Sequence, residues 1–418
     1  MQTRLSPEFA GTPEGLEAEA ILRKCVHCGF CTATCPTYQL LGDELDGPRG
    51  RIYLMKQVLE GEKPTRKTQM HLDRCLTCRN CESTCPSGVQ YGHLLDIGRK
   101  IVDAKVPRPT PEKALRWALK EGLPSPLFAP AMKMGQAVRG LLPAALQAKV
   151  PAKQEAGAWP TGSHARKVLM LAGCVQPSMM PNINAATARV LDAAGIQTVI
   201  APKAGCCGAV KFHLNDQDGG RAEMRANIDA WWPMIASGEV EALVMNASGC
   251  GVTVREYGHF LKDEPAYAAK AQRIGELTRD LSELLPAIVA ALRQSRPERV
   301  PGPPAGDAGA GRHLAFHPPC SLQHGQQLRG AVEQHLAAFG FKVQVARSES
   351  HLCCGSAGTY SVLNPDLSHQ LRDRKLGHLG ELEPDVIVSA NIGCITHLQS
   401  GTPTPVRHWV EVLDEHLR

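Results

Sequence analysis

Near its start the chain reads Cys25-Val-His-Cys28-Gly-Phe-Cys31-Thr-Ala-Thr-Cys35-Pro36, a run with the spacing C-x2-C-x2-C-x3-C-P. The spacing returns unchanged, 40 residues after Cys35, as Cys75-Leu-Thr-Cys78-Arg-Asn-Cys81-Glu-Ser-Thr-Cys85-Pro86. Two identical runs supply eight thiols, whereas a structural zinc site uses four ligands in all. Disulfides are unsuited as well, because cysteines three residues apart in a compact loop make poor bridges. The two runs therefore predict the binding of larger metal clusters.

This spacing is the one that binds [4Fe–4S] clusters in two-cluster ferredoxins, where the fourth cysteine of each run ligates the other cluster. Three thiolates from one tight loop converge on one cluster, whereas the fourth follows a turn and points the other way. We therefore predict two [4Fe–4S] clusters with crossed ligation. The predicted ligands are Cys25, Cys28, Cys31 and Cys85 for the first cluster, and Cys75, Cys78, Cys81 and Cys35 for the second.

The composition favours a reduced, multidomain protein. A length of 418 residues predicts two or three domains, and 43% hydrophobic residues suffice for substantial cores. The first eleven residues hold no apolar signal run, so we expect the 16 cysteines to be reduced in the cytoplasm. No stretch approaches 18 uninterrupted apolar residues, which predicts that no segment spans a bilayer.

Charge is distributed unevenly along the chain. The net charge is +5, but no acidic residue occurs from Gly122 to Gln154. This basic segment has few aromatic residues and no recognised binding module, so we do not expect it to bind nucleic acid. Its apolar residues, such as Leu127, Phe128, Leu141 and Leu142, permit two interpretations. They pack on the core or a partner, or they form an interfacial contact with anionic lipid.

Around the cysteine runs the apolar spacing predicts helices. We expect helices over 13–22, 52–61, 67–72 and 89–120, with a loop over 41–53 before the second of them. Because the segment between the two runs is itself predicted to be helical, we expect an α-helical ferredoxin domain and not a small β-containing one. The fold class we predict is α+β multidomain, with this domain followed by two duplicated α/β cysteine-rich domains.

From Lys167 onward short apolar runs alternate with helical patterns, and the alternation occurs twice. Strands are expected over 168–172, 197–201 and 242–246, and again over 313–316, 341–346 and 385–389. A long helix over 267–294 and a Pro/Gly-rich linker over 297–311 separate the halves. An internal duplication explains this order. The predicted segments are a ferredoxin domain 1–110, a basic helical linker 111–163, a first cysteine-rich domain 164–262, a helix and linker 263–311 and a second cysteine-rich domain 312–418.

The remaining cysteines repeat with the two halves, as C…CC-G…G-C. Each set follows predicted strands, at the carboxyl ends where open α/β sheets place their ligands. Buried structural cysteine is the simpler interpretation, but a matched pattern occurring twice favours a cofactor or thiol site, and one or two further iron–sulfur clusters there are an open alternative. The candidate residues are Cys174, Cys206, Cys207 and Cys250 in the first half, and Cys320, Cys353, Cys354 and Cys394 in the second.

The double run followed by two CC-G domains resembles the glycolate oxidase (glycolate dehydrogenase) iron–sulfur subunits. Gly42–Tyr53, Leu277–Ser282 and Phe316–Cys320 carry this resemblance, which covers nearly the whole chain. The architecture is shared with the third subunit of anaerobic glycerol-3-phosphate dehydrogenase and with D-type heterodisulfide reductase subunits.

The resemblance implies a hetero-oligomer in which a separate FAD subunit oxidises glycolate to glyoxylate. This chain then passes electrons toward a membrane quinone, from the inner face of the cytoplasmic membrane, without substrate chemistry of its own. The chain has no G-x-G-x-x-G after a strand, so we expect no flavin or nicotinamide site of its own. The alternatives are the equivalent subunit for lactate or glycerol-3-phosphate, or a heterodisulfide-type thiol–disulfide enzyme acting at the CC-G sites.

One departure weakens the heterodisulfide alternative. The CC-G domains that hold unusual clusters in that family end in C-x2-C, whereas Thr253 and His397 stand here three residues after Cys250 and Cys394. His397 is a spare ligand or an ordinary histidine. His27 lies inside the first cluster loop. His213, His317 and His351 lie near the CC-G cysteines in sequence, as candidates for roles beside the site or in proton handling.

Overall fold

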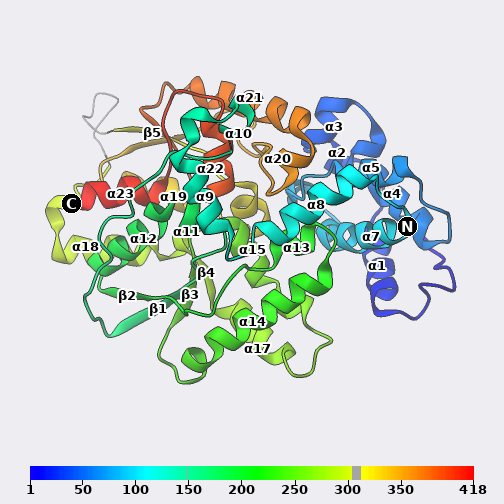
Figure 1. The fold of residues 1–418 in the computed structure, drawn as a ribbon, viewed down its shortest axis with the longest axis horizontal. Helices are drawn as coiled ribbons and strands as arrows, with labels where there is room; N and C mark the ends of the chain where they lie inside the picture. The colour runs from blue at the N-terminus through cyan, green and yellow to red at the C-terminus, as the bar shows by residue number, and fades with distance from the viewer. Residues whose placement is uncertain (148, 304–311) are drawn as a thin grey trace.

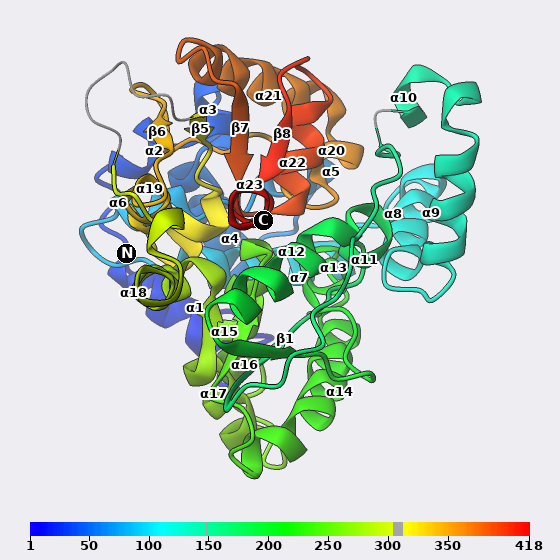
Figure 2. The same cartoon turned by 90° about the vertical axis from the view of Figure 1, so that its left-hand side faces the viewer.

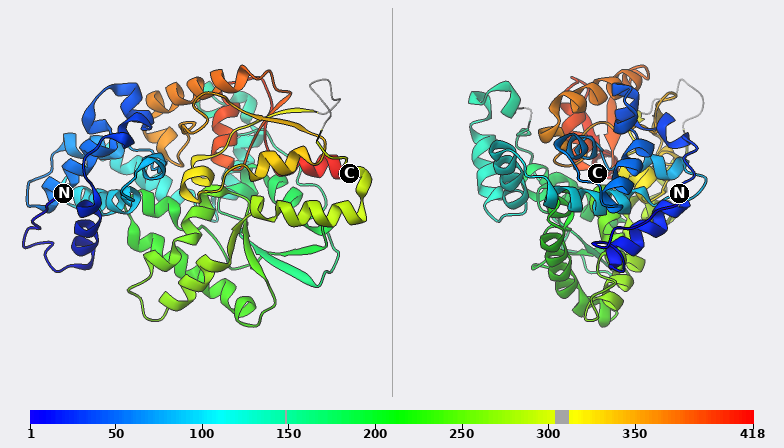
Figure 3. Two further views of the ribbon diagram at one scale, coloured as in Figure 1. Left: turned by 180° about the vertical axis from the view of Figure 1, so that it is seen from behind. Right: turned by 90° about the vertical axis from the view of Figure 1, so that its right-hand side faces the viewer.

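The computed structural model of the chain describes residues 1–147, 149–303 and 312–418. A helical part at the N-terminus is followed by two four-stranded parallel sheets covered by helices (Figure 1). Seen from behind, the N-terminal helices lie at one end of the molecule and the sheets fill the other (Figure 3). The predicted α+β class with a helical ferredoxin part and two α/β parts is confirmed.

Short helices around the cysteine runs form the N-terminal part. Thr12 caps the first of them, Pro13 occupies its first turn, and the predicted apolar face Ile52, Met55, Val58 and Leu59 is buried. The predicted loop over 41–53 is shorter than expected, because Pro48 starts a helix four residues before Ile52. The elements are α1 Pro13–Lys24, α2 Phe30–Ala33, α3 Pro36–Leu41, η1 Glu44–Asp46, α4 Pro48–Leu59, α5 Arg66–Asp73, α6 Asn80–Thr84 and α7 Tyr91–Lys105.

The helical pattern predicted over 89–120 is broken in the structure. Pro107 and Pro109 cannot continue a helix, so α7 ends at Lys105 and the next helix begins at Thr110. From there a helical arm projects beside the rest of the molecule, at the right of Figure 2. The elements of the arm are α8 Thr110–Gly122, α9 Phe128–Ala137, η2 Arg139–Leu141 and α10 Ala144–Gln147.

The two sheets have the same topology. Their strand orders are β2-β1-β3-β4 and β6-β5-β7-β8, with every neighbouring pair parallel. This identity supports the duplication inferred from sequence. The strands are β1 Arg166–Met170, β2 Ile196–Val199, β3 Ala242–Met245, β4 Thr278–Asp280, β5 His313–Phe316, β6 Lys342–Val345, β7 Val386–Ser389 and β8 Val406–His408.

The expected long helix over 267–294 is wrong. Thr278–Asp280 forms the edge strand β4 beside β3, and it divides the segment into two helices. A three-residue strand of sequence Thr-Arg-Asp has no apolar run that would reveal it, and pairing with β3 overrides the helical pattern. β8 is equally short and was not predicted. Within the predicted linker, residues 304–311 lie outside the described residues.

Helices cover both sheets. In the first half they are α11 Gln176–Met179, α12 Pro181–Ala193, α13 Ala209–His213, α14 Gln217–Ala236, α15 Ser248–Arg255, α16 Tyr257–Phe260, α17 Ala268–Leu277, η3 Leu281–Leu284, α18 Leu285–Ser295 and η4 Pro297–Arg299. In the second half they are the π-helical turn η5 Ser321–Gly325, α19 Ala331–Ala337, α20 Tyr360–Leu363, α21 Pro365–Gly380, α22 Ile392–Gln399 and α23 Trp409–Leu417.

The two halves join at the carboxyl ends of their sheets. The amide of Ser248 donates to the carbonyl of Ala390 at 3.0 Å, and α15 lies against η5. Gly325 permits this approach, since a Cβ built there would lie 2.4 Å from Val252. One continuous apolar core runs from Val190 in α12 to Val410 in α23, so the halves do not form separate globules.

His408 links the second sheet to the first. Its Nδ1 accepts from the amide of Val410 at 3.1 Å and caps α23, and its Nε2 donates to the carbonyl of Asn246 at 2.9 Å. The ring is fully buried, and this burial lowers the pKa of His408 to about 3. Because an unfolded histidine titrates near 6.5, the unfolded chain binds the extra proton between these values, and acid therefore destabilises the fold.

Titration of His408 should lower the free energy of unfolding of the wild type by about 1 kcal/mol between pH 7.5 and pH 6.0. In His408→Asn, asparagine retains a capping oxygen and removes the titration, so this part of the pH dependence disappears. Urea unfolding at both pH values measures it. The matched control is His369→Asn at an exposed position, which should leave the pH dependence unchanged. An equal pH dependence in His408→Asn and wild type would contradict the assignment.

Candidate metal centres

The two cysteine runs fold around two neighbouring cavities. The first cavity opens between the loop 25–31 and the segment that follows α6, and the exposed Cys28 places it at the protein surface. The second lies deeper, between α3, α4 and α6. The thiols lining the first are Cys25, Cys28, Cys31 and Cys85, with Cys81 behind them, and those lining the second are Cys35, Cys75, Cys78 and Cys81. Each cavity thus receives three thiols from one run and the fourth from the other.

Left-handed backbone at matched positions shapes both loops. His27 and Gly29 have φ of 55° and 85°, and their counterparts Thr77 and Arg79 have φ of 52° and 59°. This winding turns backbone N–H groups toward sulfur, and the amide of Thr77 lies 3.4 Å from Cys75 Sγ. A non-glycine residue rarely adopts this conformation. At Arg79 ion pairs to Glu82 and Glu256 hold the side chain in place.

Polar side chains surround the thiols of the second cavity. The hydroxyl of Tyr91 lies 3.7 Å from Cys75 Sγ, and Thr37 Oγ1 lies 3.3 Å from Cys35 Sγ. Arg51, with its side chain 1% exposed, donates to Thr37 and to the carbonyl of His71. These groups were not found from sequence, because Tyr91 and Arg51 stand outside the cysteine runs and no local pattern separates them from other helical residues.

A buried carboxylate balances this arginine. Asp46 is fully buried and faces Arg51, Arg74 and His71, at 3.5 Å, 2.8 Å and 3.1 Å respectively. Buried charges persist in proteins only when they are paired or hydrogen-bonded. The resulting network fixes the loop before α4 against α5, and with it the wall of the second cavity.

The cysteines of the two sheet-containing parts lie after the carboxyl ends of the strands, as expected from the sequence. Cys174, Cys206, Cys207 and Cys250 follow β1, β2 and β3 at the carboxyl edge of the first sheet, in mutual contact. In the second half Cys320, Cys353, Cys354 and Cys394 follow β5, β6 and β7 in the same way. Cys320 and Cys353 are 3.8 Å apart at sulfur. The contact with Cys353 and burial raise the pKa of Cys320. The contact with Cys320 acts to lower the pKa of Cys353, but the contact with Cys354 and burial outweigh it and raise that pKa.

The second cysteine-rich set lies next to the ferredoxin part. Cys353 packs in one apolar cluster with Leu76 and Tyr360, and Cys78 and Cys320 border the same cluster. The side-chain Nδ2 of Asn80 donates to the carbonyl of His351 at 3.4 Å, which ties α6 to the loop before Cys353. The second ferredoxin cavity and the second-half thiols are therefore neighbours in space, although more than 200 residues separate them in the chain.

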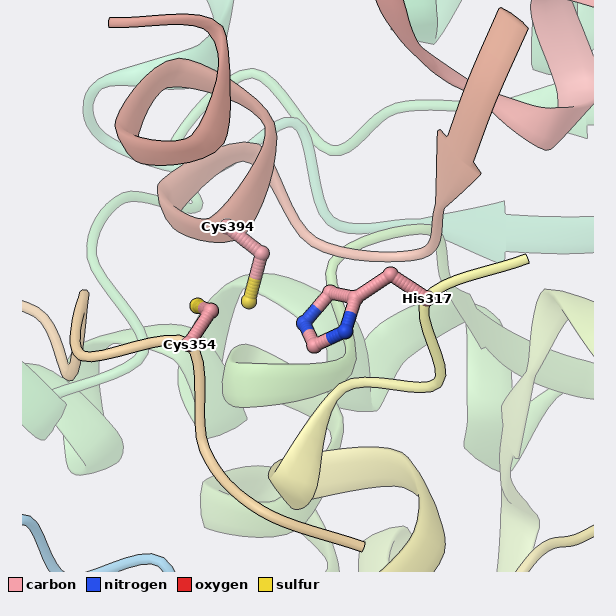
Figure 4. Close-up of side chains that lie close together, drawn as sticks. All are labelled: His317, Cys354 and Cys394. Carbon is pink, nitrogen blue, oxygen red and sulfur yellow. The ribbon is translucent and has the colours of Figure 1, made fainter. Parts of the chain in front are cut away.

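The candidate histidines have different surroundings. His27 lines the first cavity, and burial lowers its pKa. His317 is fully buried beside Cys354 and Cys394, with its pKa lowered by burial (Figure 4). His397 bonds to Ser368 at 3.0 Å, which engages it away from the thiols. His213, the last residue of α13, is exposed and lies near Arg99 and Glu256 at the ferredoxin boundary, and His351 is half-buried beside the second-half set.

Ion pairs fix the ferredoxin part to the first half. His93 stacks on His259 with ring centroids 3.8 Å apart, and both bond to carboxylates, His93 to Glu256 and His259 to Glu17. The hydrogen bond from His259 lowers the pKa of Glu17 to about 2. Burial acts against ionisation of Glu256, but His93 and Arg79 outweigh it and lower its pKa to about 2. These groups were not predicted from the sequence, since they meet only across the domain boundary.

Comparisons with known proteins agree with this layout. Residues 21–89 match the family of 4Fe-4S dicluster domains, and residues 168–255 and 314–399 each match the cysteine-rich domain family. The glycolate oxidase iron–sulfur subunit of Escherichia coli (strain K12) is 55% identical over 100% of this chain and 99% of its own length. The probable glycolate oxidase iron–sulfur subunit of Bacillus subtilis (strain 168) is 30% identical over 92% of this chain and 89% of its own. Lactate utilization protein A of Bacillus licheniformis is 26% identical over 59% of this chain.

A substitution at Arg51 tests the role of the polar side chains around the second cavity. In Arg51→Met the fully buried Asp46 loses one of its three cationic or imidazole partners, and Thr37 loses its donor. We expect a loss of about 3 kcal/mol in the free energy of unfolding, because breaking a buried ion pair leaves an uncompensated charge. Urea unfolding followed by circular dichroism measures it.

The matched control is Arg49→Met. Arg49 pairs with Glu44, and their side chains are 38% and 40% exposed. An exposed pair contributes less than about 1 kcal/mol, so this variant should unfold close to wild type. Equal losses in the two variants would show that the buried network does not support the second cavity.

Proposed function

Because the chain belongs to the family of glycolate oxidase iron–sulfur subunits, we propose that it accepts electrons from an FAD subunit that oxidises glycolate to glyoxylate, and passes them toward a membrane quinone. As a member of this family the chain is an electron-transfer component of an oxidoreductase complex, and it works with other subunits in a hetero-oligomer. The substrate chemistry, in this proposal, takes place on the partner.

The observation that carries the proposal is the pair of neighbouring cavities, each lined by three thiols of one run and at least one of the other. Four thiolates are the donor set of a [4Fe–4S] cluster, so the residues fit this group. The proposed ligands are Cys25, Cys28, Cys31 and Cys85 in one cavity, and Cys75, Cys78, Cys81 and Cys35 in the other. When bound, such clusters supply one-electron redox chemistry.

This chain's own residues set the conditions for that chemistry. Leu94 and Leu95 in α7 belong to an apolar core that also holds Cys25, Cys75 and Cys81. The hydroxyl of Tyr91 donates to Cys75 Sγ, and a hydrogen bond to a ligating sulfur stabilises the more negative, reduced state. Arg51 places a positive charge in the same buried region.

We propose that the flavin subunit docks at the mouth of the first cavity. Val26 and Phe30 are 69% and 60% exposed beside the exposed Cys28, which is unusual for large apolar side chains next to a redox site. Exposed apolar groups of this kind mark contact surfaces. A partner seated there covers the outer cavity, while the second cavity, deeper in the chain, lies toward the cysteine-rich parts.

The alternative of thiol–disulfide chemistry at the CC-G sites finds less support. Reactive cysteines are partly exposed thiols with a lowered pKa. Here Cys207, Cys353 and Cys354 are buried. A hydrogen bond from one neighbouring thiol acts to lower the pKa of each, but the contact with the other neighbouring thiol and burial outweigh it, so the pKa of all three is raised. The second of these sets is proposed instead as an additional metal site.

A direct test uses the full chain purified without oxygen, with and without the flavin subunit. We expect about eight irons and eight acid-labile sulfides from the two ferredoxin-type sites. Glycolate should bleach the iron–sulfur absorbance only when the flavin subunit is present. Cys35→Ser and Cys85→Ser should each alter a different electron paramagnetic resonance signal of the reduced protein, since the two fourth ligands belong to different cavities.

Several outcomes would redirect the proposal. Bleaching by lactate or glycerol-3-phosphate, with none by glycolate, would assign the chain to the equivalent complex for that substrate. Reduction of a disulfide by the isolated chain would favour the heterodisulfide-type enzyme. Identical spectral changes in Cys35→Ser and Cys85→Ser would contradict the crossed ligation.

We propose that the arm α8–α10 contacts the membrane at the cytoplasmic face. Among the described residues no helix is long and apolar enough to cross a bilayer. The arm exposes Leu127, Met134 and Leu141 at 74%, 68% and 86%, next to the exposed Lys133. Apolar side chains with basic neighbours are the features of an interfacial contact with anionic lipid. Lys149, by contrast, bonds within the chain, to Ser361.

The lipid contact predicts a loss of vesicle binding in the triple variant Leu127→Gln, Met134→Gln, Leu141→Gln. Burying each of these side chains contributes more than about 1 kcal/mol, so we expect the fraction sedimenting with anionic vesicles to fall about tenfold or more. Leu16→Gln, which alters a leucine 53% exposed on α1, is the control and should bind like wild type. Unchanged sedimentation of the triple variant would assign the arm to packing against a protein partner.

A further inference from the structure

The second cysteine-rich set contains a buried histidine with no hydrogen-bond partner. His317 directly follows β5 and is 0% exposed, and neither Nδ1 nor Nε2 has a partner among the described residues. Figure 4 shows the ring pointing toward Cys354 and Cys394, which come from the loop after β6 and from α22. A ligand nitrogen of His317 and the two sulfurs all lie within 4.8 Å of one another.

The backbone around His317 is held on both sides. Its amide donates to the carbonyl of Val388 at 2.8 Å, and its own carbonyl accepts from Ser389 Oγ at 3.0 Å. The ring is therefore aimed at the thiols by the sheet itself. Leaving a buried polar group unpaired costs about 1–3 kcal/mol, so a fixed, unpaired imidazole calls for a missing partner. A metal ion bonded to one ring nitrogen supplies it.

We propose that His317, Cys354 and Cys394 bind one divalent metal ion with an affinity for thiolate, Zn²⁺ or Fe²⁺. Metal–sulfur and metal–nitrogen bonds are about 2.3 Å and 2.0–2.1 Å long, so donors that share one tetrahedral ion lie roughly 3.5–4 Å apart. The three donors in the structure meet within a similar span. The cysteines of a [4Fe–4S] cluster, in contrast, bind four different irons at its corners.

Two further residues suit this site. Cys353 is in side-chain contact with Cys354, and we take it as the fourth ligand, which gives a Cys₃His donor set of the kind that binds a single ion. Lys375 is 2% exposed and interacts electrostatically with Cys353 and Cys354. Three thiolates on a divalent ion leave one negative charge, which this buried ammonium balances.

The first half lacks the histidine. The residue three positions before Cys174 is Leu171, as His317 is three positions before Cys320. Leu171 is 4% exposed and packs in the apolar core with Met224 and Trp231. The duplicated halves therefore differ in their donor chemistry. The inference builds on the proposal that the second cysteine-rich set binds metal, and it does not depend on how the ferredoxin sites act.

The test measures metal content. Full-length wild type, His317→Leu and His317→Cys are purified without oxygen, washed with chelator and analysed for iron, zinc and sulfide. We expect wild type to hold about one metal ion beyond the eight irons of the ferredoxin sites. His317→Leu introduces the residue found in the first half and should lose that ion alone, whereas His317→Cys should retain it, since thiolate replaces imidazole. His351→Leu, at the half-buried neighbour, is the control and should keep it.

The outcomes separate clearly. Wild type without metal beyond the ferredoxin iron, or His317→Leu with the wild-type content, would overturn the proposal and leave the electron-transfer function intact. Four additional irons with sulfide would mean a cluster, which also contradicts a single ion. If His317→Leu loses the ferredoxin iron as well, X-ray absorption on His317→Cys decides the matter. A nitrogen ligand replaced by sulfur supports the site, and an unchanged spectrum overturns it.

Discussion

The convergence of thiols from two separate runs on two shared cavities is the constraint on which the N-terminal part depends. Each cavity takes its fourth thiol from the other run, and Cys81 borders both. Neither run can therefore be positioned alone, so α2 and α6 must meet, and the left-handed residues around Cys28 and Cys78 must hold their loops tight. The helices α1, α4 and α7 supply the apolar core that fixes this arrangement.

Charged side chains are buried around the second cavity. Arg51 lines the second cavity beside its thiols, and it is itself paired with the fully buried Asp46. Such a pair adds little net stability but is costly to break. Its value lies in positioning, because it ties the loop before α4 to α5 and to the backbone of His71. At the interface with the first half, the ion pair between Arg79 and Glu256 likewise holds two elements in place.

The duplication produced two sheets of one topology with unequal surroundings. Both place their cysteines at the carboxyl ends of parallel strands. Among the described residues, only the second set borders Leu76 and Cys78 of the ferredoxin part in a shared apolar cluster, and it carries His317 where the first has Leu171. The two halves share one strand topology but differ in the residues that follow the strands. Functional residues usually lie in such loops, so the difference concerns the chemistry of the two sites and not their fold.

The sequence by itself determined the cluster-binding runs, the fold class and the duplicated order of strands, because cysteine spacing and apolar periodicity are local patterns. It did not determine β4 and β8, since strands of three residues exist only through pairing with β3 and β7. Nor did it find Arg51, Tyr91 or the contact of His93 with His259, whose partners come from other elements. His317 was a candidate by its position in the chain alone, and only the folded sheet aims its ring at Cys354 and Cys394. Spacing along the chain fixes which residues share a loop, whereas tertiary packing decides which loops share a site.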